Sequence, residues 1–349
     1  MPTLSNDLHL GFVHLTVSNL ERSLAFYQDS LGFQVHRQAG DTAYLGAGGP
    51  DLLALTERPG ATRYPRRTGL YHFAILVPSR LELARVIRRV AESRAPVQGA
   101  SDHLVSEALY LADPDGNGIE MYRDRPRAEW PQTNGIVRMD TLPLDIDGVL
   151  SELDQVSGPW AGLHPETVLG HMHLHVRDIP EALAFYRDVL GFDLMFNMGS
   201  ALFVSAGGYH HHLGLNIWGT QGAAPSPPES IGLRYFTIQL PTQAVVEAVL
   251  ERARAAGAAV EEHPVGKLVR DQSMNGLVFT ASRMPENDLP PGLAQPALRA
   301  LKAAGYTRLE QFTQISEADL LKLHGMGPKA IGLIRSALDA RGLSFTNPD

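Results

Sequence analysis

Apolar and polar residues alternate over short stretches of this chain and then recur with helical spacing. The segments GFVHLTVSNLERSLAFYQDSLGF, from residue 11, and GHMHLHVRDIPEALAFYRDVLGF, from residue 170, show this change most clearly. Alternation is typical of a strand with one buried face, and the later spacing is typical of an amphipathic helix. Each segment therefore predicts a strand followed by a helix, and the two segments resemble each other.

Two weaker copies of the pattern follow, TGLYHFAILVPSRLELARVIRRVAE from residue 68 and IGLRYFTIQLPTQAVVEAVLERARA from residue 231. Short β-like runs with Gly, Asp and Asn turns come after each helix. We therefore predict an α+β fold with four β-α-β-β-β modules, numbered one to four, that begin near residues 9, 69, 169 and 231. In our alignment of the copies, His14 corresponds to His173 and His72 corresponds to Tyr235.

The modules divide the chain into four parts. Residues 9–125 hold modules one and two, and residues 169–281 hold modules three and four. Residues 126–168 are predicted as an ordered linker, with a short helix around Val149–Asp154. Residues 289–346 are rich in Ala and Leu with helical spacing, so we expect a small all-α domain there.

Composition narrows the class of protein. The chain has 349 residues and no cysteine, which excludes disulfides, thiolate metal sites and a cysteine nucleophile. Its net charge of −8 argues against a broadly nucleic-acid-coating protein. The first residues lack the features of a signal peptide, and no apolar run approaches the roughly 18–20 residues that span a bilayer. We therefore expect a cytoplasmic protein without membrane contact.

Strand alternation predicts which of the chain's 14 histidines face the concave side of a sheet. The residues expected to pack under the helices are the apolar set Val13, Leu15, Val17, Met172, Leu174 and Val176. The opposite, concave faces then carry the polar set His14, His72, Glu120, His171, His173 and His175. The run HHHLGLNIW, from residue 210, is predicted as a strand with His210 and His212 facing inward.

The modular pattern over residues 9–281 resembles the vicinal oxygen chelate superfamily. The phrases LYHFAILVPSR, DHLVSEALYLADPDGNGIEMYRDRP and GGYHHHLGLNIW resemble two-domain extradiol ring-cleaving enzymes of the catechol 2,3-dioxygenase type. In that superfamily, modules pair so that their curved sheets enclose a metal site. The resemblance implies Fe(II), with Mn(II) as the alternative, bound by His72, Glu120 and one further histidine, since two histidines and one carboxylate form the facial triad of non-haem iron oxygenases.

The third ligand depends on which modules pair. If module one pairs with module two, His14 completes the site, and if module two pairs with module three, His173 does. We favour His173, because polar residues gather in modules two and three and buried polar groups are costly unless they are used. His171 and His175 are then expected to flank the ligand.

The resemblance also implies catalytic residues around the metal. Tyr110 is expected to hydrogen-bond a substrate oxygen, and His103 is expected to contact the substrate. His212 is the candidate acid–base histidine, because an imidazole with a pKa near neutrality can take and return a proton.

The expected reaction is ring cleavage of a catechol or hydroquinone-type aromatic diol by O2. One alternative is a glyoxalase-like metal-dependent isomerase or lyase, which commonly uses more than one carboxylate, whereas only Glu120 is placed for that role here. Another alternative is a non-enzymatic small-molecule-binding protein without a metal triad. A homo-oligomer is compatible with each of these functions.

The C-terminal segment carries a separate motif. In SEADLLKLHGMGPKAIGLIRSALDAR, residues 316–341, Ser316 and Asp319 indicate a capping box, and Pro328 suits the first position of a helix. LHGMGPKAI resembles a helix-hairpin-helix motif, whose hairpin amides and basic residue, here Lys329, contact DNA phosphates. We therefore expect a weak DNA or protein contact through this segment.

Overall fold

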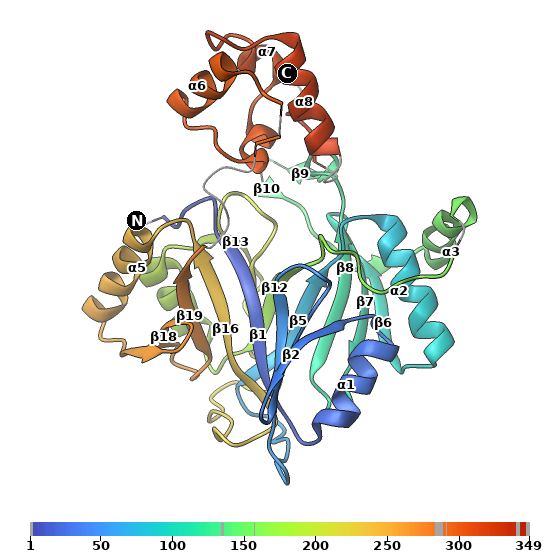
Figure 1. Cartoon of the computed structure of the whole chain (residues 1–349). Helices are drawn as coiled ribbons and strands as arrows, with labels where there is room; N and C mark the ends of the chain where they lie inside the picture. Colours follow the sequence, from blue (N-terminus) through green and yellow to red (C-terminus); the bar gives the residue numbers. More distant parts are fainter. Residues whose placement is uncertain are drawn as a thin grey trace.

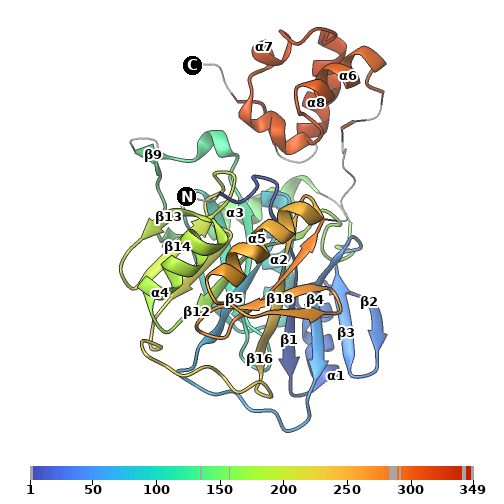
Figure 2. The same cartoon turned by 90° about the vertical axis from the view of Figure 1, so that its left-hand side faces the viewer.

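The computed structural model describes residues 3–133, 136–156, 158–282, 289–290, 292–339 and 343–346. Figure 1 shows a body of two sheets side by side, with helices on its outer sides and a separate group of helices above it. Figure 2 shows the same helical group above the sheets, and Arg308 of this group lies 2.7 Å from His9 at the start of β1 (His9–Val17), measured from Nη2 to Nε2. The fold is therefore α+β, with a small helical unit at the C-terminal end.

Most of the described strands belong to one of two large sheets. The eight-stranded sheet has the order β17 (Val260–His263), β18 (Gly266–Arg270), β19 (Gly276–Ala281), β16 (Gly232–Leu240), β1 (His9–Val17), β4 (Asp51–Glu57), β3 (Thr42–Gly46) and β2 (Gln34–Ala39). The nine-stranded sheet has the order β11 (Leu142–Pro143), β6 (Val97–Asp102), β7 (Ser106–Ala112), β8 (Gly118–Asp124), β5 (Gly69–Leu76), β12 (Val168–His175), β15 (Leu213–Asn216), β14 (Ala201–Ser205) and β13 (Asp193–Asn197). The short strands β9 (Gln132–Thr133) and β10 (Ile136–Val137) pair separately.

The order of strands shows how the modules combine. Strand β5 of module two pairs antiparallel with β12 of module three, and β1 of module one pairs antiparallel with β16 of module four. The pairing of modules two and three that the sequence favoured is therefore confirmed. Residues 9–125 and 169–281 each contribute strands to both sheets.

Each module places a helix after its first strand. These helices are α1 (Leu20–Asp29), α2 (Arg80–Ser93), α4 (Ile179–Leu183), which continues as the π-helix η3 (Ala184–Leu190), and α5 (Gln243–Ala255). Each begins at a short polar residue whose side chain accepts a hydrogen bond from the helix backbone: Asn19, Ser79, Asp178 and Thr242. Such caps satisfy backbone N–H groups that the first helical turn leaves free.

An equivalent tyrosine–aspartate hydrogen bond joins the two modules within each half of the chain. Tyr27 of α1 donates a hydrogen bond to Asp113, which precedes β8, over 3.1 Å. Tyr186 of η3 donates to Asp271, which precedes β19, over 3.0 Å. The helix of one module thus packs against the turn of the next, while the sheets join modules across the halves.

The apolar residues expected beneath the helices form the main core. Val13, Leu15 and Val17 of β1 have no exposed surface, and neither do Met172 and Leu174 of β12. All belong to one continuous apolar cluster that draws on all four modules. Burial of one strand face fixes its register, since a shift of one residue would exchange the buried and concave sets.

The predicted linker is ordered where the structure describes it. It contains η1 (Arg127–Glu129), β9, β10, β11, the helix α3 (Ile146–Leu150) and η2 (Ser151–Gln155). Strand β11 pairs with β6, and Val149 of α3 is fully buried in the main core. The helix expected around Val149–Asp154 therefore begins slightly earlier, and residues 134, 135 and 157 of the linker lie outside the described part.

The C-terminal unit has a hydrophobic core of its own, which includes Leu301, Phe312 and Ile334. Its helices are α6 (Gln295–Ala303), η4 (Leu309–Gln314), α7 (Glu317–Leu320) and α8 (Pro328–Asp339).

The capping geometry expected in this unit is present. The Ser316 hydroxyl accepts a hydrogen bond from the Asp319 N–H over 3.1 Å, and Pro328 is the first residue of α8. Arg335 donates to Glu317, and Lys322 donates to Asp319, so acidic partners neutralise both cations. A DNA or protein contact through residues 316–341 stays a prediction, and residues 340 and 341 lie outside the described part.

Across the described ranges, no helix combines the length and apolar character needed to cross a membrane.

Candidate metal centre

The site is built around a small residue, Ala74, in the middle of the nine-stranded sheet. In the parallel pair of β5 and β8, Ala74 lies opposite Glu120. In the antiparallel pair of β5 and β12, Ala74 lies opposite His171. Because alanine carries only a methyl group, the side chains of Glu120 and His171 can reach toward each other across it.

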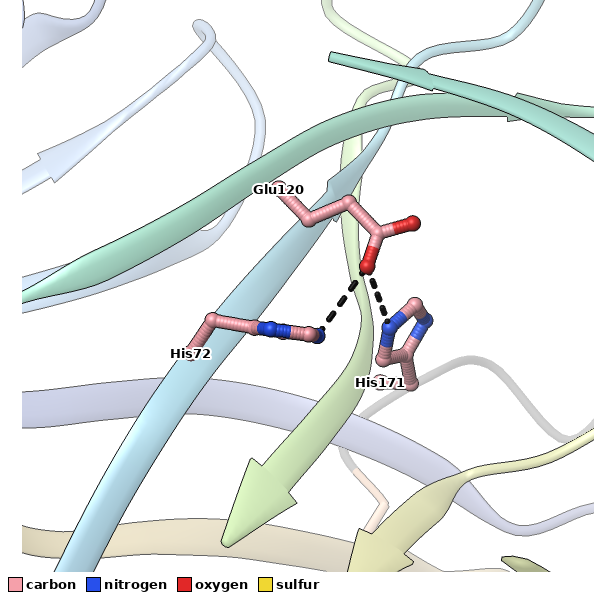
Figure 3. Close-up of side chains that lie close together, drawn as sticks. All are labelled: His72, Glu120 and His171. Carbon is pink, nitrogen blue, oxygen red and sulfur yellow. Dashed lines mark hydrogen bonds and ion pairs between the residues drawn. The ribbon is translucent and has the colours of Figure 1, made fainter. Parts of the chain in front are cut away.

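His72 joins this pair from the same strand as Ala74. Residues two apart on a strand project from the same face, so His72 shares the concave face with Ala74. Figure 3 shows His72 and His171 approaching one carboxylate oxygen of Glu120 from two sides. The nitrogen Nε2 of each ring lies 3.0 Å from Glu120 Oε2. One ligand atom from each of the three residues lies within 4.8 Å of the others.

All three side chains are withdrawn from solvent. Burial lowers the pKa of the His72 imidazole, which favours the neutral form that binds metals. Burial alone raises the pKa of the Glu120 carboxyl, but His171 and His72 outweigh this effect and hold that pKa well below its usual range. The group therefore combines neutral imidazole with an ionised carboxylate, which is the donor set of the facial triad.

The geometry fits a metal ion. His72 Nε2 is a buried nitrogen that has no hydrogen-bond partner among the described residues, despite its distance of 3.0 Å from Glu120. Buried polar atoms without partners are rare and demand an explanation, such as an ion. Two ligand atoms at right angles, each about 2.1 Å from a metal, lie about 3.0 Å apart. Glu120 thus has the spacing of an adjacent metal ligand to each of the two histidines.

The structure places His171, rather than the predicted third ligand His173, beside Glu120. His173 is paired directly with His72 across the strands, and their ring centroids are 4.9 Å apart. It therefore lies two residues further along β12 than His171, on the side away from Glu120. Its ring packs over Gly214, where an added Cβ atom would stand 2.9 Å from the imidazole.

His14, the alternative third ligand, lies in the other sheet on β1. Its Nε2 is 2.7 Å from the Thr56 hydroxyl, and its ring packs edge-on against Tyr235 at 4.9 Å between centroids. Burial, with a smaller contribution from the charge of Arg234, lowers the pKa of His14 to about 3. His14 is therefore a neutral, hydrogen-bonded histidine of the eight-stranded sheet.

This shifted pKa gives a prediction about stability. Above roughly pH 6.5, His14 is neutral in both folded and unfolded chains and has no effect on the pH dependence. Between roughly pH 6.5 and 3, the unfolded chain binds a proton that the folded chain excludes. The free energy of unfolding therefore decreases by up to about 1.4 kcal/mol for each unit by which the pH is lowered. His14→Gln should reduce this slope, as measured by urea unfolding at several pH values from 7 to 4. Parallel curves of unfolding free energy against pH for the variant and the wild type would contradict this prediction.

The acid–base histidine is also placed differently from the expectation. The strand predicted from residue 210 begins only at Leu213, so alternation does not hold for the preceding histidines. His211 packs on His171 with ring centroids 4.2 Å apart. His212 instead accepts hydrogen bonds at Nδ1 from the Ser205 hydroxyl and from the Ala206 N–H, over 2.9 and 3.3 Å. His211, not His212, is thus the histidine of this run that borders the cluster.

Tyr110 and His103 form a hydrogen-bonded pair on the same concave face. Tyr110 lies opposite Glu120 in the pairing of β7 with β8, and its hydroxyl is 2.6 Å from His103 Nε2. Burial raises the pKa of Tyr110, and the charge of Glu120 raises it further. His103 Nδ1 is 2.8 Å from the carbonyl oxygen of Asp140, which can only accept. In neutral His103, the Nδ1–H therefore donates to that carbonyl, and Nε2 accepts from Tyr110.

Tyr71 packs beside the cluster, although strand alternation places its side chain on the face opposite to His72. The pairing of β5 with β12 skips Tyr71, because His72 pairs with His173 while Leu70 pairs with Leu174. Such a bulge redirects a side chain. The Tyr71 ring accordingly packs on His72 and His173 at 5.1 and 4.9 Å between centroids, and on Trp218 at 5.4 Å.

The sequence does hold a signal for His171. The capping residues of the four module helices are Asn19, Ser79, Asp178 and Thr242. Seven positions before these caps stand Phe12, His72, His171 and Tyr235. Alignment on the caps therefore equates His171 with His72, whereas His173 and His14 both stand five positions before their caps and do not match His72. No comparable signal marks the bulge at Tyr71.

The same alignment explains why the eight-stranded sheet lacks an equivalent cluster. Phe12 and Tyr235 occupy the positions of His171 and His72, and Val278 occupies that of Glu120. These three residues pack together with Leu268 in a small apolar cluster. The donor set is therefore confined to the sheet of modules two and three.

Comparison with known families agrees with this fold. The profile of the Glyoxalase/Bleomycin resistance protein/Dioxygenase superfamily matches residues 9–121 and 168–271. These two matches cover both pairs of modules and more than half of the chain. The protein belongs to this superfamily.

Individual relatives include enzymes of two kinds. The chain is 48% identical over 277 residues to catechol-2,3-dioxygenase of Bacillus subtilis (strain 168), covering 78% of this chain and 96% of that protein. It is 30% identical over 124 residues to lactoylglutathione lyase of Haemophilus influenzae, covering 32% of this chain and 89% of the lyase. A solved structure from Bacillus subtilis subsp. subtilis str. 168 has a TM-score of 0.53 at 12% identity, over 81% of this chain and 86% of that one. At that identity the structural likeness shows the fold alone.

Proposed function

We propose that this protein is a metal-dependent extradiol dioxygenase that opens a catechol-type aromatic ring with O2. The observation that carries the proposal is the buried cluster of His72, Glu120 and His171, two imidazoles and one carboxylate on one face of a candidate ion. The 48% identity to a protein named catechol-2,3-dioxygenase supports the same reaction. Fe(II) is the proposed metal, and Mn(II) suits the same ligands.

When bound, the metal would act as a Lewis acid on two neighbouring substrate oxygens and bring O2 to the same centre. The protein supplies the surroundings for that chemistry. His72, Glu120 and His171 would hold the ion from one side, and their burial excludes bulk water from that side. Because Glu120 contributes one negative charge, a singly deprotonated diol would balance the remaining charge of a divalent ion.

His103 and Tyr110 are proposed to position the substrate. The Tyr110 proton is directed to His103 Nε2, so the lone pairs of the Tyr110 oxygen remain free to accept from a substrate hydroxyl. The Asp140 carbonyl holds the tautomer of His103 that makes this possible. Tyr110 thus orients a diol rather than donating its own proton, which agrees with its raised pKa.

His211 is proposed as the general base, organised by a chain of hydrogen bonds that begins at Asp124. His210 Nε2 is 2.9 Å from Asp124 Oδ1, and His210 Nδ1 is 2.9 Å from His211 Nδ1. An ionised Asp124 only accepts, so neutral His210 donates from Nε2 and accepts at Nδ1. His211 then donates from Nδ1, which leaves its Nε2 lone pair free to take a proton. Burial lowers the pKa of His211, which also favours this neutral form.

Tyr71 and Trp218 are proposed to form one wall of the substrate site. Both are large aromatic residues with substantial exposure, 38% for Tyr71 and 42% for Trp218. They lie in contact with each other and with His173, next to the metal ligands. Aromatic rings attract other aromatic rings in edge-on or offset contacts.

Removal of this wall should weaken substrate binding more than the chemical step. Tyr71→Ala should raise KM about fivefold to tenfold with a smaller change in kcat, because a ring contact contributes about 0.5–1.5 kcal/mol beyond its buried area. Tyr71→Phe keeps the ring and should behave like the wild type. Steady-state kinetics with catechol measure both parameters, and a loss confined to kcat in the alanine variant would contradict the assignment.

The reaction itself is tested by loading the purified protein with Fe(II), adding catechol without O2 and then admitting O2. A yellow ring-opened product should form after O2 enters, with one O2 consumed per ring. Protein loaded with Zn(II), which has no redox chemistry, is the matched control and should give no product. Absence of product with a panel of catechols and hydroquinones would overturn the proposal.

A lyase or isomerase is the second candidate, favoured by the match to lactoylglutathione lyase over a third of the chain. Such enzymes commonly use a second carboxylate as base. Glu120 is the single carboxylate in the cluster found among the described residues. Turnover of a 2-oxoaldehyde thiol adduct in the absence of O2, with a divalent metal of any kind, would favour this candidate.

A further inference from the structure

A cavity lies away from the metal centre, on the side of the body formed by α1, α2 and the linker. Its volume is about 470 Å³. It is enclosed by the end of α1, the start of β2, one face of α2 and linker residues 159–162. None of the residues of the metal centre contributes to its walls.

One wall of this cavity is strongly basic. Arg85, Arg88 and Arg89 all line it, and their spacing of three and four residues places them on one face of α2. All three are half-buried. Glu92, one turn beyond, is the single acidic residue of the lining. The walls therefore carry an excess of positive charge.

The positive charge is only partly neutralised within the protein. Arg85 is paired with Glu82 at 2.6 Å, whereas Arg88 approaches Glu92 no closer than 4.0 Å. Arg89 donates to the backbone carbonyl of Asp29 over 2.5 Å. That carbonyl is neutral, and no ion pair joins Arg89 to a carboxylate in the described part of the chain. Arg89 thus has hydrogen-bonding capacity left for an anion.

The linker contributes Trp160 to the wall of this cavity, with its indole N–H shielded from the open space. Trp160 lines the cavity, and its indole Nε1 is a buried atom without a hydrogen-bond partner among the described residues. An indole N–H can only donate, and a buried donor left unpaired costs about 1–3 kcal/mol. The indole ring packs closely against Gly32, where an added Cβ atom would lie 2.4 Å from the ring. Gly32 also has a positive φ of 76°, so glycine is required at this position.

We propose that this cavity binds a small organic anion through a phosphate or carboxylate group. The guanidinium groups of Arg88 and Arg89 supply the paired donors that planar or tetrahedral oxyanions prefer. The side-chain amides of Gln28 and Gln34, also in the lining, can complete the contacts at the rim.

Such a ligand would connect three separate pieces of the chain. α2 belongs to module two, α1 belongs to module one, and Trp160 belongs to the linker. Binding to the folded form alone stabilises it by mass action. The anion is therefore expected to raise the thermal midpoint of unfolding and to change the fluorescence of Trp160.

The experiment titrates the full-length protein with phenyl phosphate in one arm and with phthalate in the other. Binding is followed by thermal unfolding and by tryptophan fluorescence. One or both anions should give a saturable shift, and the arm with the lower Kd identifies the preferred group. Arg89→Gln should raise that Kd at least about tenfold, since a hydrogen bond to a charged group contributes about 1.5–3 kcal/mol.

Trp160→Phe separates the indole N–H from the ring. It should leave Kd unchanged and the unliganded protein at least as stable, because the N–H that it removes is unpaired and shielded from the cavity. Arg254→Gln on α5, which removes an exposed charge paired with Glu247 at 3.7 Å, is the matched control and should leave Kd unchanged. No saturable shift with either anion would overturn the proposal, and so would a shift that persists unchanged in Arg89→Gln.

Discussion

His171→Ala should abolish stable metal binding and reduce kcat for ring cleavage by more than about 100-fold, whereas His173→Ala should retain the metal. Removal of a group behind a metal ligand typically costs about 10–100-fold in affinity or activity, and loss of a ligand itself is expected to exceed this range. His171 Nε2 lies 3.0 Å from the Glu120 oxygen that also faces His72. His173 has no such approach to Glu120 and instead packs beside His72.

Metal analysis of the two purified variants, after loading and dialysis, decides between the histidines. Both substitutions remove one buried imidazole from β12, so the pair is matched for burial and for strand. Circular dichroism and urea unfolding establish that each variant is folded. If His173→Ala loses the metal and His171→Ala keeps it, the assignment of His171 is wrong.

Ala74→Val should damage the metal centre without removing any ligand atom. Ala74 has no exposed surface and lies between Glu120 on one neighbouring strand and His171 on the other. Two added methyl groups would occupy the space across which these side chains meet. Overpacking of this kind typically destabilises a protein by about 1–3 kcal/mol. We expect in addition a fall in metal affinity of at least about tenfold.

Ala43→Val provides the matched control for this substitution. Ala43 on β3 is equally buried, and it lies in the eight-stranded sheet. It should show a comparable loss of stability with normal metal affinity. Metal titration and urea unfolding measure the two effects separately. Equal metal affinity in the two valine variants would show that the space above Ala74 is not critical for the ligands.

Local patterns were sufficient for most of the architecture. Alternation identified the buried faces of β1 and β12 correctly, because one apolar face of a strand must pack against the helices. The change from alternation to helical spacing predicted where strand gives way to helix in each module. His72 and Glu120 were found together because each sits on a regular strand, where the side-chain direction follows from position alone.

Local patterns failed where the backbone departs from regular geometry. The bulge in β5 turns Tyr71 toward the concave face, and its cause lies in the pairing with β12. The segment before Leu213 is not a strand, so His211 rather than His212 borders the cluster. In both places the side-chain direction depends on contacts with another part of the chain.

The sequence by itself determined the four modules, the concave position of His72 and Glu120, and the family to which the chain belongs. Only the tertiary structure decided that His171 completes the cluster. All three histidines of β12 face the same side, so alternation cannot choose among them. The choice is made by the register between β12 and β5, which sets His171 opposite Ala74 and leaves His173 opposite His72. That register arises from backbone hydrogen bonds between strands roughly 100 residues apart, which alternation along a single strand does not specify.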